Sequence, residues 1–485
     1  MLRICFVVNA VHQWERIGLL TLSSVLKKAN HHVVLYDIRG KSEKTILRDI
    51  KLRHPDVLAY SAMSNEIGPL LRVNRLIRAN VSHRCKSIFG GPHPTFFPDI
   101  IAEEHVDAVC RGEAEDSLPL YLQYLNGHHS PNEIHGFIIR HDNSVITNPP
   151  GRRPENLDDI PFPDRELWDP IDRTAIQKSF FASRGCPYKC AYCFNPAYNA
   201  LYADSGAAVR RRSVDNFLSE IKDVLVRYSK AYPFFDDDSF LMAPLEWLEE
   251  FSDRYRREVR RPFGCNVRAD QVTEEKVRIL AGAGWHYCWF GIECGDEEFA
   301  NRVLHRRLSN EQIRSAARLL HSYKIWFATQ NINALPSDRP VEIDEKTLRL
   351  NLECRPGFAM AHIFYPFPGT ELAEYSRAKG LFDGDLSRLG DPLCLRSPLG
   401  FDRKRKNELE RQSRLFGTVV AFPWLRRFLP GLRKLPLGWI YSAVYFLQMG
   451  YCTRIKLWPA RKGFRYYASM AGLLVRRLAQ ACRYV

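Results

Sequence analysis

The sequence predicts an α/β protein of two strand–helix units followed by a helical region rich in basic and aromatic residues. Short apolar runs of strand length alternate with helical patterns through residues 1–140, and the alternation resumes over residues 179–382. Beyond residue 383 the strand patterns stop and helical patterns rich in Arg, Trp and Tyr replace them. A chain of 485 residues is long enough for two or three domains with buried cores.

The N-terminal unit, residues 1–140, contains five buried strand patterns. They are Ile4 to Val8, Val33 to Tyr36, Val57 to Ser61, Ser87 to Gly90 and Ala108 to Cys110. Their alternation with helices predicts a doubly wound, Rossmann-like parallel sheet that binds ligands at the carboxyl ends of its strands. Gly90 and Gly91 follow the fourth strand, where glycine lets the backbone approach a ligand closely. Residues 141–178 are rich in Pro and in charge, which predicts a linker.

Residues 179–382 carry six further strand patterns. They are Phe180 to Ser183, Pro233 to Asp236, Phe263 to Val267, Tyr287 to Ile292, Phe327 to Ile332 and Ala359 to Tyr365. Six strands and their helices predict a partial (βα)6 barrel of the TIM type, with its site at the carboxyl ends of the strands. Asp236, Asp237, Arg268 and Glu293 follow or end such strands. A carboxylate after a strand is also typical of a helix N-cap, and Asp238 fits that alternative.

Three cysteines, Cys186, Cys190 and Cys193, lie within eight residues in the run from Ser183 to Pro196. Thiolates are the soft ligands of iron–sulfur clusters, and three at this spacing suit one face of a cubane, with a fourth iron left open. A structural zinc ion needs a fourth ligand. The nearest candidates, Cys265 and His286, lie far downstream.

The remaining cysteines have scattered spacings, which argues for reduced thiols rather than a disulfide scaffold. Five of them lie in apolar surroundings and are expected to be buried, namely Cys5, Cys85, Cys110, Cys288 and Cys354.

The cysteine run resembles the signature of the radical S-adenosylmethionine (radical SAM) superfamily, Cys-x3-Cys-x2-Cys with an aromatic residue, here Tyr192, before the last cysteine. The resemblance implies that Cys186, Cys190 and Cys193 hold a [4Fe-4S] cluster whose open iron chelates S-adenosylmethionine (SAM). One electron then cleaves SAM to a 5′-deoxyadenosyl radical. An electron donor such as flavodoxin or ferredoxin is implied as a partner.

The same resemblance assigns roles at the strand ends of the predicted barrel. It implies that Asp236 and Asp237 lie beside the methionine amine of SAM. It places Arg268 near the SAM carboxylate and Glu293 near the ribose hydroxyls. The run from Gln330 to Asn333, after the fifth strand, either contacts adenine or substrate or makes hydrogen bonds within the rim.

The N-terminal unit resembles the cobalamin-binding domain found ahead of many radical SAM domains. The similar motifs are Gly18-Leu-Leu-Thr-Leu22, Ser61-Ala-Met-Ser64, Gly90-Gly-Pro-His-Pro94 and the run from Val106 to Glu115. The resemblance implies a corrin over the strand ends, with its nucleotide tail inserted towards Ser61, Gly90 and Gly91. His12 lacks the Asp-x-His-x-x-Gly pattern, so we expect a loop histidine and no protein histidine on the lower face of the cobalt.

The net charge of +15 is concentrated in the last 85 residues, where 18 Lys and Arg oppose 3 Asp and Glu. Basic residues mixed with Trp, Tyr and Leu are typical of an interfacial helix on an anionic lipid surface. A helical cap over the barrel and, from the uncharged stretch 435–453, a membrane span are the alternatives. Nucleic acid is not expected, because no recognised nucleic-acid module accompanies the charge. The N-terminus lacks a signal-peptide pattern, so we expect a cytoplasmic protein that contacts the membrane surface.

The two resemblances together imply a cobalamin-dependent radical SAM enzyme, similar to the class B methyltransferases, that methylates an unactivated carbon. The deoxyadenosyl radical would take a hydrogen atom from the substrate, and the corrin would donate a methyl group. Contact with a membrane would favour a lipid, isoprenoid or tetrapyrrole substrate. The alternatives are an oxidative cyclase of the magnesium-protoporphyrin ester cyclase type and a non-catalytic metal-binding or membrane-scaffold protein. No catalytic residue is predicted beyond the cofactor ligands.

Overall fold

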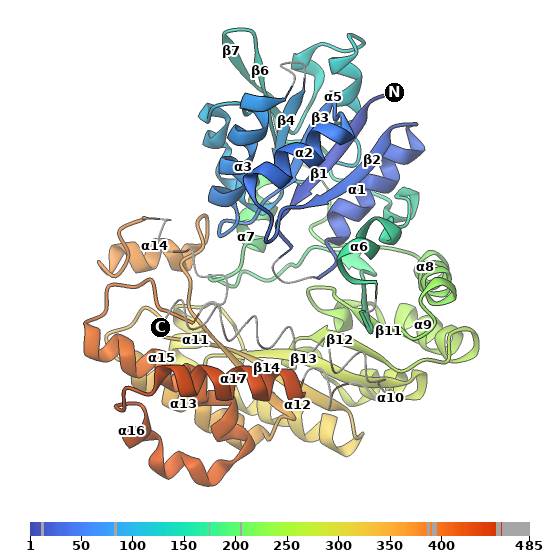
Figure 1. The fold of residues 1–485 in the computed structure, drawn as a ribbon. Coiled ribbons are helices and arrows are strands. Elements are labelled where there is room, and N and C mark those ends of the chain that lie inside the picture. The colour runs from blue at the N-terminus through green and yellow to red at the C-terminus, as the bar shows by residue number, and fades with distance from the viewer. Residues whose placement is uncertain are drawn as a thin grey trace. The chain divides into compact units, whose positions relative to one another are not determined.

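The computed structural model describes residues 1–10, 14–81, 85–173, 175–203, 206–385, 389, 395–452 and 457 (Figure 1). The chain divides into two compact units, residues 1–179 with 197–216 and residues 180–196 with 217–485. The predicted α/β fold class is confirmed, with a sheet in each unit. The predicted domain limits stay predictions; the first compact unit takes in the predicted linker 141–178, which contains a strand over residues 144–147 and a short helix over 169–172.

The first unit is built on a seven-stranded sheet in the order β2-β1-β3-β4-β5-β6-β7. The strands are β1 (Arg3–Val8), β2 (His32–Asp37), β3 (Val57–Ser61), β4 (Lys86–Gly90), β5 (Ala108–Cys110), β6 (Phe137–His141) and β7 (Ser144–Thr147). The first five pair in parallel, and β6 and β7 extend the sheet antiparallel. The strand order reverses direction between β1 and β3, which is where doubly wound sheets open a crevice for ligands.

Helices cover both faces of this sheet (Figure 1). The helices are α1 (Ile17–Lys28), α2 (Glu43–Arg53), α3 (Ile67–Asn80), α4 (Pro92–Phe96), α5 (Ser117–Leu125), α6 (Asp169–Asp172) and α7 (Asn195–Leu201). In β1, Ile4 and Phe6 pack in a core with α1 and α5, whereas Cys5 and Val7 pack in a second core with α2 and α3. Both faces of the strand are therefore buried, which explains why it reads as a continuous apolar run. The five cysteines expected to be buried are all buried.

The second unit is built on a six-stranded sheet in the order β15-β14-β13-β12-β11-β8. The strands are β8 (Gln177–Phe180), β11 (Tyr232–Phe235), β12 (Phe263–Val267), β13 (Trp285–Glu293), β14 (Trp326–Asn333) and β15 (Phe358–Ile363). Pairing from β11 to β15 is parallel. The first predicted strand, Phe180 to Ser183, is displaced in the structure, because β8 already ends at Phe180 and a separate element, β9 (Ser183–Arg184), leads into the cysteines. With β8 and β15 as edge strands the sheet stays open, as a partial barrel does.

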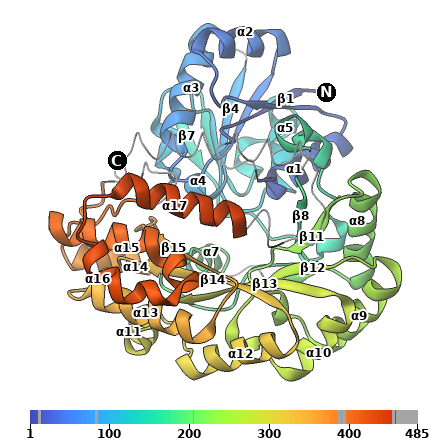
Figure 2. The ribbon, with the colours of Figure 1, turned by 60° about the horizontal axis from the view of Figure 1, so that its bottom comes forward.

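Helices α9, α10 and α12 line one side of this sheet (Figure 2). The helices are α8 (Val214–Arg227), α9 (Leu245–Glu258), α10 (Glu274–Ala283), α11 (Glu297–Arg302), α12 (Asn310–Ser322), α13 (Pro340–Cys354), α14 (Glu371–Ala378), α15 (Arg403–Ala421), α16 (Leu429–Leu432) and α17 (Gly438–Tyr451). Helix α15 packs closely on β15, because a side-chain Cβ at Gly417 would lie 2.6 Å from the carbonyl oxygen of Ala359. Among the described residues of the C-terminal region, 403–421 and 438–451 are α-helical, as predicted, with short helical turns over 423–432 between them; the predicted helical region beyond residue 457 lies outside the described residues.

One buried ion pair ties the elements of the first unit together. Asp107 precedes β5 and accepts hydrogen bonds from Nη1 of Arg78 at 2.5 Å and from the backbone N–H of Ser87 at 2.8 Å. Lys86 lies 3.2 Å from the same carboxylate. Arg78 belongs to α3 and Ser87 to β4, so one carboxylate joins a helix to two strands.

We expect Asp107→Ala to lower the free energy of unfolding of this unit by about 3 kcal/mol, because the buried Arg78 loses the carboxylate that compensates its charge. Urea denaturation followed by circular dichroism measures the change. Glu104→Ala is the matched control, since the Glu104 side chain is 71% exposed and its loss should cost under about 0.5 kcal/mol. Equal losses in the two variants would contradict this role of Asp107.

Candidate functional site

Cys186, Cys190 and Cys193 lie on one loop of the second unit, between β9 and α7. The loop folds back on itself, because the N–H of Cys193 donates to the carbonyl of Cys190 at 3.0 Å. Cys190 is buried and the other two are half-buried. Burial raises the pKa of Cys186 to about 11 and that of Cys193 to about 12, so these thiols give up their protons only to a strong competitor such as a metal.

The donor set of this loop fits a cluster better than a single metal ion. Within the described residues, no three His, Cys, Asp or Glu side chains converge on a point where one metal ion could sit. The thiolates of a cubane each bind a different iron and need not converge. Cys265, a candidate fourth zinc ligand, is buried inside β12 opposite Cys288, and His286 lies in β13 with its pKa lowered by burial. Three soft donors on one loop suit an iron–sulfur cluster.

Asp237 holds the backbone that leads into the cysteine loop. It is fully buried, and its carboxylate accepts hydrogen bonds from the N–H groups of Ala182 at 3.2 Å and Ser183 at 2.6 Å. The Ser183 hydroxyl donates to the same carboxylate. Asp237 therefore positions the backbone before the cysteines, and its place beside the amine of SAM stays a prediction.

The two aspartates beside it have different partners. Asp236 is half-buried at the rim and accepts from Nδ2 of Asn266 at 3.0 Å. Asp238 accepts from Nδ2 of Asn195 at 2.8 Å, and the N–H of Asn195 points at the Cys193 sulfur at 3.5 Å. The N-cap alternative for Asp238 is wrong, because Ser239 and Pro244 occupy the N-cap positions of the next two helices.

Arg268 lies against the cysteine loop. Its Nη1 is 3.8 Å from the sulfur of Cys190, and its guanidinium stacks over the ring of Tyr188 at 4.0 Å from the centroid. Its Nε donates to Asp270 at 3.0 Å. Arg268 is thus held beside a predicted cluster ligand by an acid and an aromatic ring.

A buried arginine that the sequence analysis did not single out, Arg306, joins several predicted site residues. Its Nη1 donates to the hydroxyl of Tyr192 at 2.9 Å, and its Nη2 donates to the carbonyl of Gly291 at 2.5 Å. Burial alone would lower the pKa of Arg306, but Tyr192, Glu293 and Cys190 raise it further than burial lowers it. The guanidinium is therefore a fixed charge. Burial also raises the pKa of Glu293, and Arg306 opposes that rise.

Strained backbone gathers at the carboxyl ends of β13 and β14. Glu293 has φ of 61° at a bulge in β13, and Ala334, directly after β14, has φ of 57°. His305 and Arg307, on either side of Arg306, have φ of 55° and 49°. A non-glycine residue in this left-handed region costs about 1–3 kcal/mol, and such residues cluster at functional sites.

Two asparagines at the end of β14 differ in their hydrogen bonding. Asn331 is hydrogen-bonded within the fold, through Thr329, Asn351 and the carbonyl of Met360. Asn333 is fully buried, yet neither its side-chain nitrogen nor its oxygen has a hydrogen-bond partner among the described residues. Each unmade hydrogen bond of a buried amide costs about 1–3 kcal/mol, so Asn333 is the better candidate to contact a ligand.

In the first unit, Ser61 and Gly90 end the adjacent strands β3 and β4 and face each other in the register. Gly91 has φ of 93°, and a Cβ there would lie 2.9 Å from the Ala62 nitrogen. A side chain there would clash with the Ala62 backbone and the Ser61 hydroxyl, so the close packing of the two strand ends requires glycine at residue 91. His93 is buried nearby with its pKa lowered to about 4, and His12 lies outside the described residues.

Comparison with known proteins matches both units. A B12 binding domain matches residues 4–122 and the radical SAM superfamily matches residues 181–345. An uncharacterized methyltransferase of Pyrococcus horikoshii is 26% identical, over 75% of this chain and 79% of that protein. The hopanoid C-3 methylase of Methylococcus capsulatus is 24% identical, over 74% and 68%. The structure of the cobalamin-dependent S-adenosylmethionine radical enzyme OxsB has the same fold, with a TM-score of 0.67 at 16% identity, over all of this chain and 80% of that one.

We expect Arg306→Met to reduce iron retention by the loop about 10- to 100-fold, because residues behind metal ligands orient them. Iron bound per chain after anaerobic reconstitution and desalting measures this. The reduced protein should also lose the change in its electron paramagnetic resonance signal on addition of SAM, and Arg306→Lys should restore part of both readouts.

Arg307→Met is the matched control, because the Arg307 side chain is exposed beside the same strained backbone. Equal loss of iron in Arg306→Met and Arg307→Met would assign the effect to the backbone of the loop and contradict the positioning role of Arg306.

Proposed function

The chain belongs to the cobalamin-dependent radical SAM methyltransferases, and we propose that it methylates an unactivated carbon of a hydrophobic substrate. The observation that carries the proposal is the three-thiol loop at the carboxyl ends of a partial barrel, in a chain that also has a B12 binding domain. When bound, the [4Fe-4S] cluster supplies the electron that cleaves one SAM molecule to a 5′-deoxyadenosyl radical, and the corrin supplies a methyl group taken from a second.

We assign Cys186, Cys190 and Cys193 as the iron ligands, supported by their common loop and by the match of residues 181–345 to the radical SAM superfamily. Tyr192 and Arg306 brace this loop, and Asp237 fixes the strand end before it. These side chains hold the thiols in place rather than contact substrate.

We assign four polar residues at the carboxyl ends of the strands to SAM. The carboxylate of Asp236 can accept from the methionine amine, and that of Glu293 can accept two hydrogen bonds from the ribose diol. Asn333 carries a donor and an acceptor that can pair with adenine. Arg268, beside Cys190, matches the SAM carboxylate in charge.

We assign the nucleotide tail of the corrin to the edge formed by Ser61, Gly90 and Gly91. The position of Ser61 and Gly90 at the paired carboxyl ends of β3 and β4, inside the match to a B12 binding domain, supports this role. His93, at the start of α4 after this edge, is buried, and its Nδ1 is hydrogen-bonded to the Ser64 hydroxyl at 3.1 Å.

A hydrophobic substrate is supported by an exposed aromatic and basic face in the C-terminal region. We define this lipid face by the exposed residues Phe422, Trp424, Arg426, Arg427, Phe428, Lys434, Leu435 and Trp439. Trp424 and Trp439 are each 59% exposed, which is unusual for tryptophan in water and typical of a membrane interface. None of the described helices has the length and hydropathy of a membrane span. The name of the hopanoid methylase relative also favours a membrane-borne substrate.

Methyl transfer is tested with SAM that carries a labelled methyl group. We expect label in the organic phase when the reconstituted, reduced enzyme is incubated with a solvent extract of cells that encode it. The same extract should release 5′-deoxyadenosine from SAM. An unlabelled product formed with deoxyadenosine release would contradict methyl transfer and support the cyclase alternative.

Cys190→Ala should abolish release of 5′-deoxyadenosine, because the two thiolates that remain are too few to hold the cluster. The far-ultraviolet circular dichroism should stay unchanged. Cys354→Ala is the control: this cysteine is also buried but ends α13, away from the loop, and its loss should preserve cleavage. Cleavage retained in Cys190→Ala would support the non-catalytic alternative.

We expect Trp424→Ser with Trp439→Ser to reduce binding to vesicles of phosphatidylcholine and phosphatidylglycerol at least about 10-fold, because each indole contributes roughly 1–2 kcal/mol of apolar burial in the interface. Vesicle co-sedimentation measures the change. Trp247→Ser, in α9 of the same unit, controls for the loss of a tryptophan elsewhere. Unchanged sedimentation of the double variant would contradict the lipid face.

A further inference from the structure

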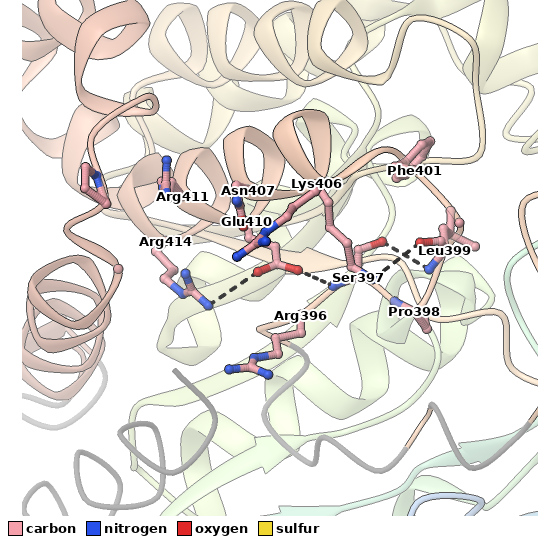
Figure 3. A pocket seen from close by; sticks show the side chains of 14 residues that line it. Arg396, Ser397, Pro398, Leu399, Phe401, Lys406, Asn407, Glu410, Arg411 and Arg414 are labelled. Atoms are coloured by element: carbon pink, nitrogen blue, oxygen red, sulfur yellow. Dashed lines mark hydrogen bonds and ion pairs between the residues drawn. The ribbon is translucent and has the colours of Figure 1, made fainter.

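A cavity of about 670 Å³ lies in the second unit, between the N-terminal half of α15 and the segment 396–401 (Figure 3). Its lining residues are Arg396, Ser397, Pro398, Leu399, Gly400, Phe401, Arg403, Lys406, Asn407, Glu410, Arg411, Arg414, Pro436 and Gly438. Its volume is within the range of small-molecule sites. Five of the lining residues are cations and one is an acid.

Four of the six cations of α15 line the cavity. Arg403, Lys406, Arg411 and Arg414 recur at intervals of three, five and three, which keeps them within about one half of the helix circumference. The other side of the helix is apolar and buried in the core, for example at Phe416. Like charges on one helix face repel each other, so this arrangement destabilises the helix unless an anion compensates it.

The acid in the lining, Glu410, does not neutralise this face. It is buried and accepts a hydrogen bond from the N–H of Ser397 at 2.9 Å, and its carboxylate lies 3.9 Å from Nη2 of Arg414. Glu410 therefore fixes the segment 396–401 against the helix and pairs with one cation (Figure 3).

The other three cations that α15 contributes to the cavity have no carboxylate partner in the part of the chain that the structure describes. Lys406 points to the carbonyl of Leu399 at 3.5 Å, and Arg411 donates to the carbonyls of Arg433 and Lys434 at 3.2 and 3.0 Å. Arg403 is exposed at the mouth of the cavity. A backbone carbonyl accepts a hydrogen bond from a cation but has no net charge to neutralise it. About three positive charges therefore face the cavity uncompensated.

The cavity lies towards the same end of the sheet as the cysteine loop. Helix α15 runs antiparallel to β15, because Ser413 contacts the carbonyl of Ala361 and Gly417 approaches that of Ala359. The first turns of α15 therefore extend past the carboxyl end of β15. Leu399 belongs to the same apolar core as Ala191, the residue after Cys190.

We propose that this cavity binds the phosphate or diphosphate group of an amphipathic molecule. The inference that this molecule is the substrate rests on the proposed function. Guanidinium groups match phosphate oxygens bidentately, and a diphosphate carries about as many negative charges as the cavity has uncompensated positive ones. The substrate class is then a phosphorylated lipid or isoprenoid, with its apolar part left for the radical site.

The test is isothermal titration of the full chain with inorganic pyrophosphate, at constant ionic strength maintained with sodium chloride. We expect saturable binding at one site per chain, weakened at least tenfold in the double variant Lys406→Gln with Arg411→Gln. The double variant Lys404→Gln with Arg405→Gln is the matched control, because it removes the same charge from the same helix outside the cavity. Absence of binding, or equal weakening in both variants, would overturn the proposal.

A second measurement does not depend on the stability of a variant. Pyrophosphate should protect Lys406 of the unaltered chain from acetylation, read by mass spectrometry, and leave Lys404 reactive. No protection of Lys406 would overturn the site.

Vesicles with and without phosphatidic acid distinguish the source of the phosphate. The gain in vesicle binding that phosphatidic acid adds should be displaced by pyrophosphate, whereas binding through the lipid face should not. A gain from phosphatidic acid that pyrophosphate fails to displace would place the phosphate contact outside the cavity and count against the proposal. Titration with pyrophosphate needs neither cluster nor SAM, so its failure leaves the methyl-label test standing. Absence of labelled product would instead overturn the proposed function while the pyrophosphate site stands.

Discussion

The second unit is organised around the need to compensate a charge held away from water. The Arg306 guanidinium is buried, and its contacts with the Tyr192 hydroxyl and the Gly291 carbonyl fix the cysteine loop and the end of β13 on the same group. Without such partners a buried cation is strongly unfavourable. The bulge in β13 and the left-handed backbone at Glu293 are consequences, because they turn the carboxylate towards this charge. The cost in backbone strain is offset by the polar contacts it allows.

The three consecutive aspartates after β11 have different structural roles. The side chain of Asp237 faces inward and satisfies two backbone N–H groups before the cysteine loop. Asp236 and Asp238 stay nearer the rim, where one meets Asn266 and the other Asn195. One buried acid thus stabilises the loop, and its neighbours place polar groups along the carboxyl ends of the strands.

The C-terminal region combines two surfaces on one short stretch of chain. The apolar side of α15 completes the core over β15, and its basic side lines the cavity. The lipid face follows directly after this helix. A phosphorylated, membrane-borne substrate would engage both surfaces, with its polar end in the cavity and its chain in the lipid. Such a substrate would explain why the C-terminal region carries an excess of positive charge, which by itself repels and opposes folding.

The sequence by itself determined most of the strands and the cofactor class. Five strands of each sheet follow from apolar runs of the right length, since burial on both faces is a local pattern. The cysteine spacing also identifies its chemistry, because ligands close in sequence need no fold to bring them together. The break between β8 and β9 was not predicted, because hydrogen bonding with neighbouring strands, rather than apolarity, ends a strand.

Only the tertiary structure decided which polar residues hold the site and which remain for a ligand. Asp236 and Asp237 are adjacent and chemically alike, and their partners come from segments some thirty to fifty-five residues away. Arg306 follows a helix in a run of basic residues, with no local signal of burial. The cavity, in turn, depends on a segment folding back along α15. Burial and compensation of charge depend on contacts between distant segments, and a linear pattern does not contain them.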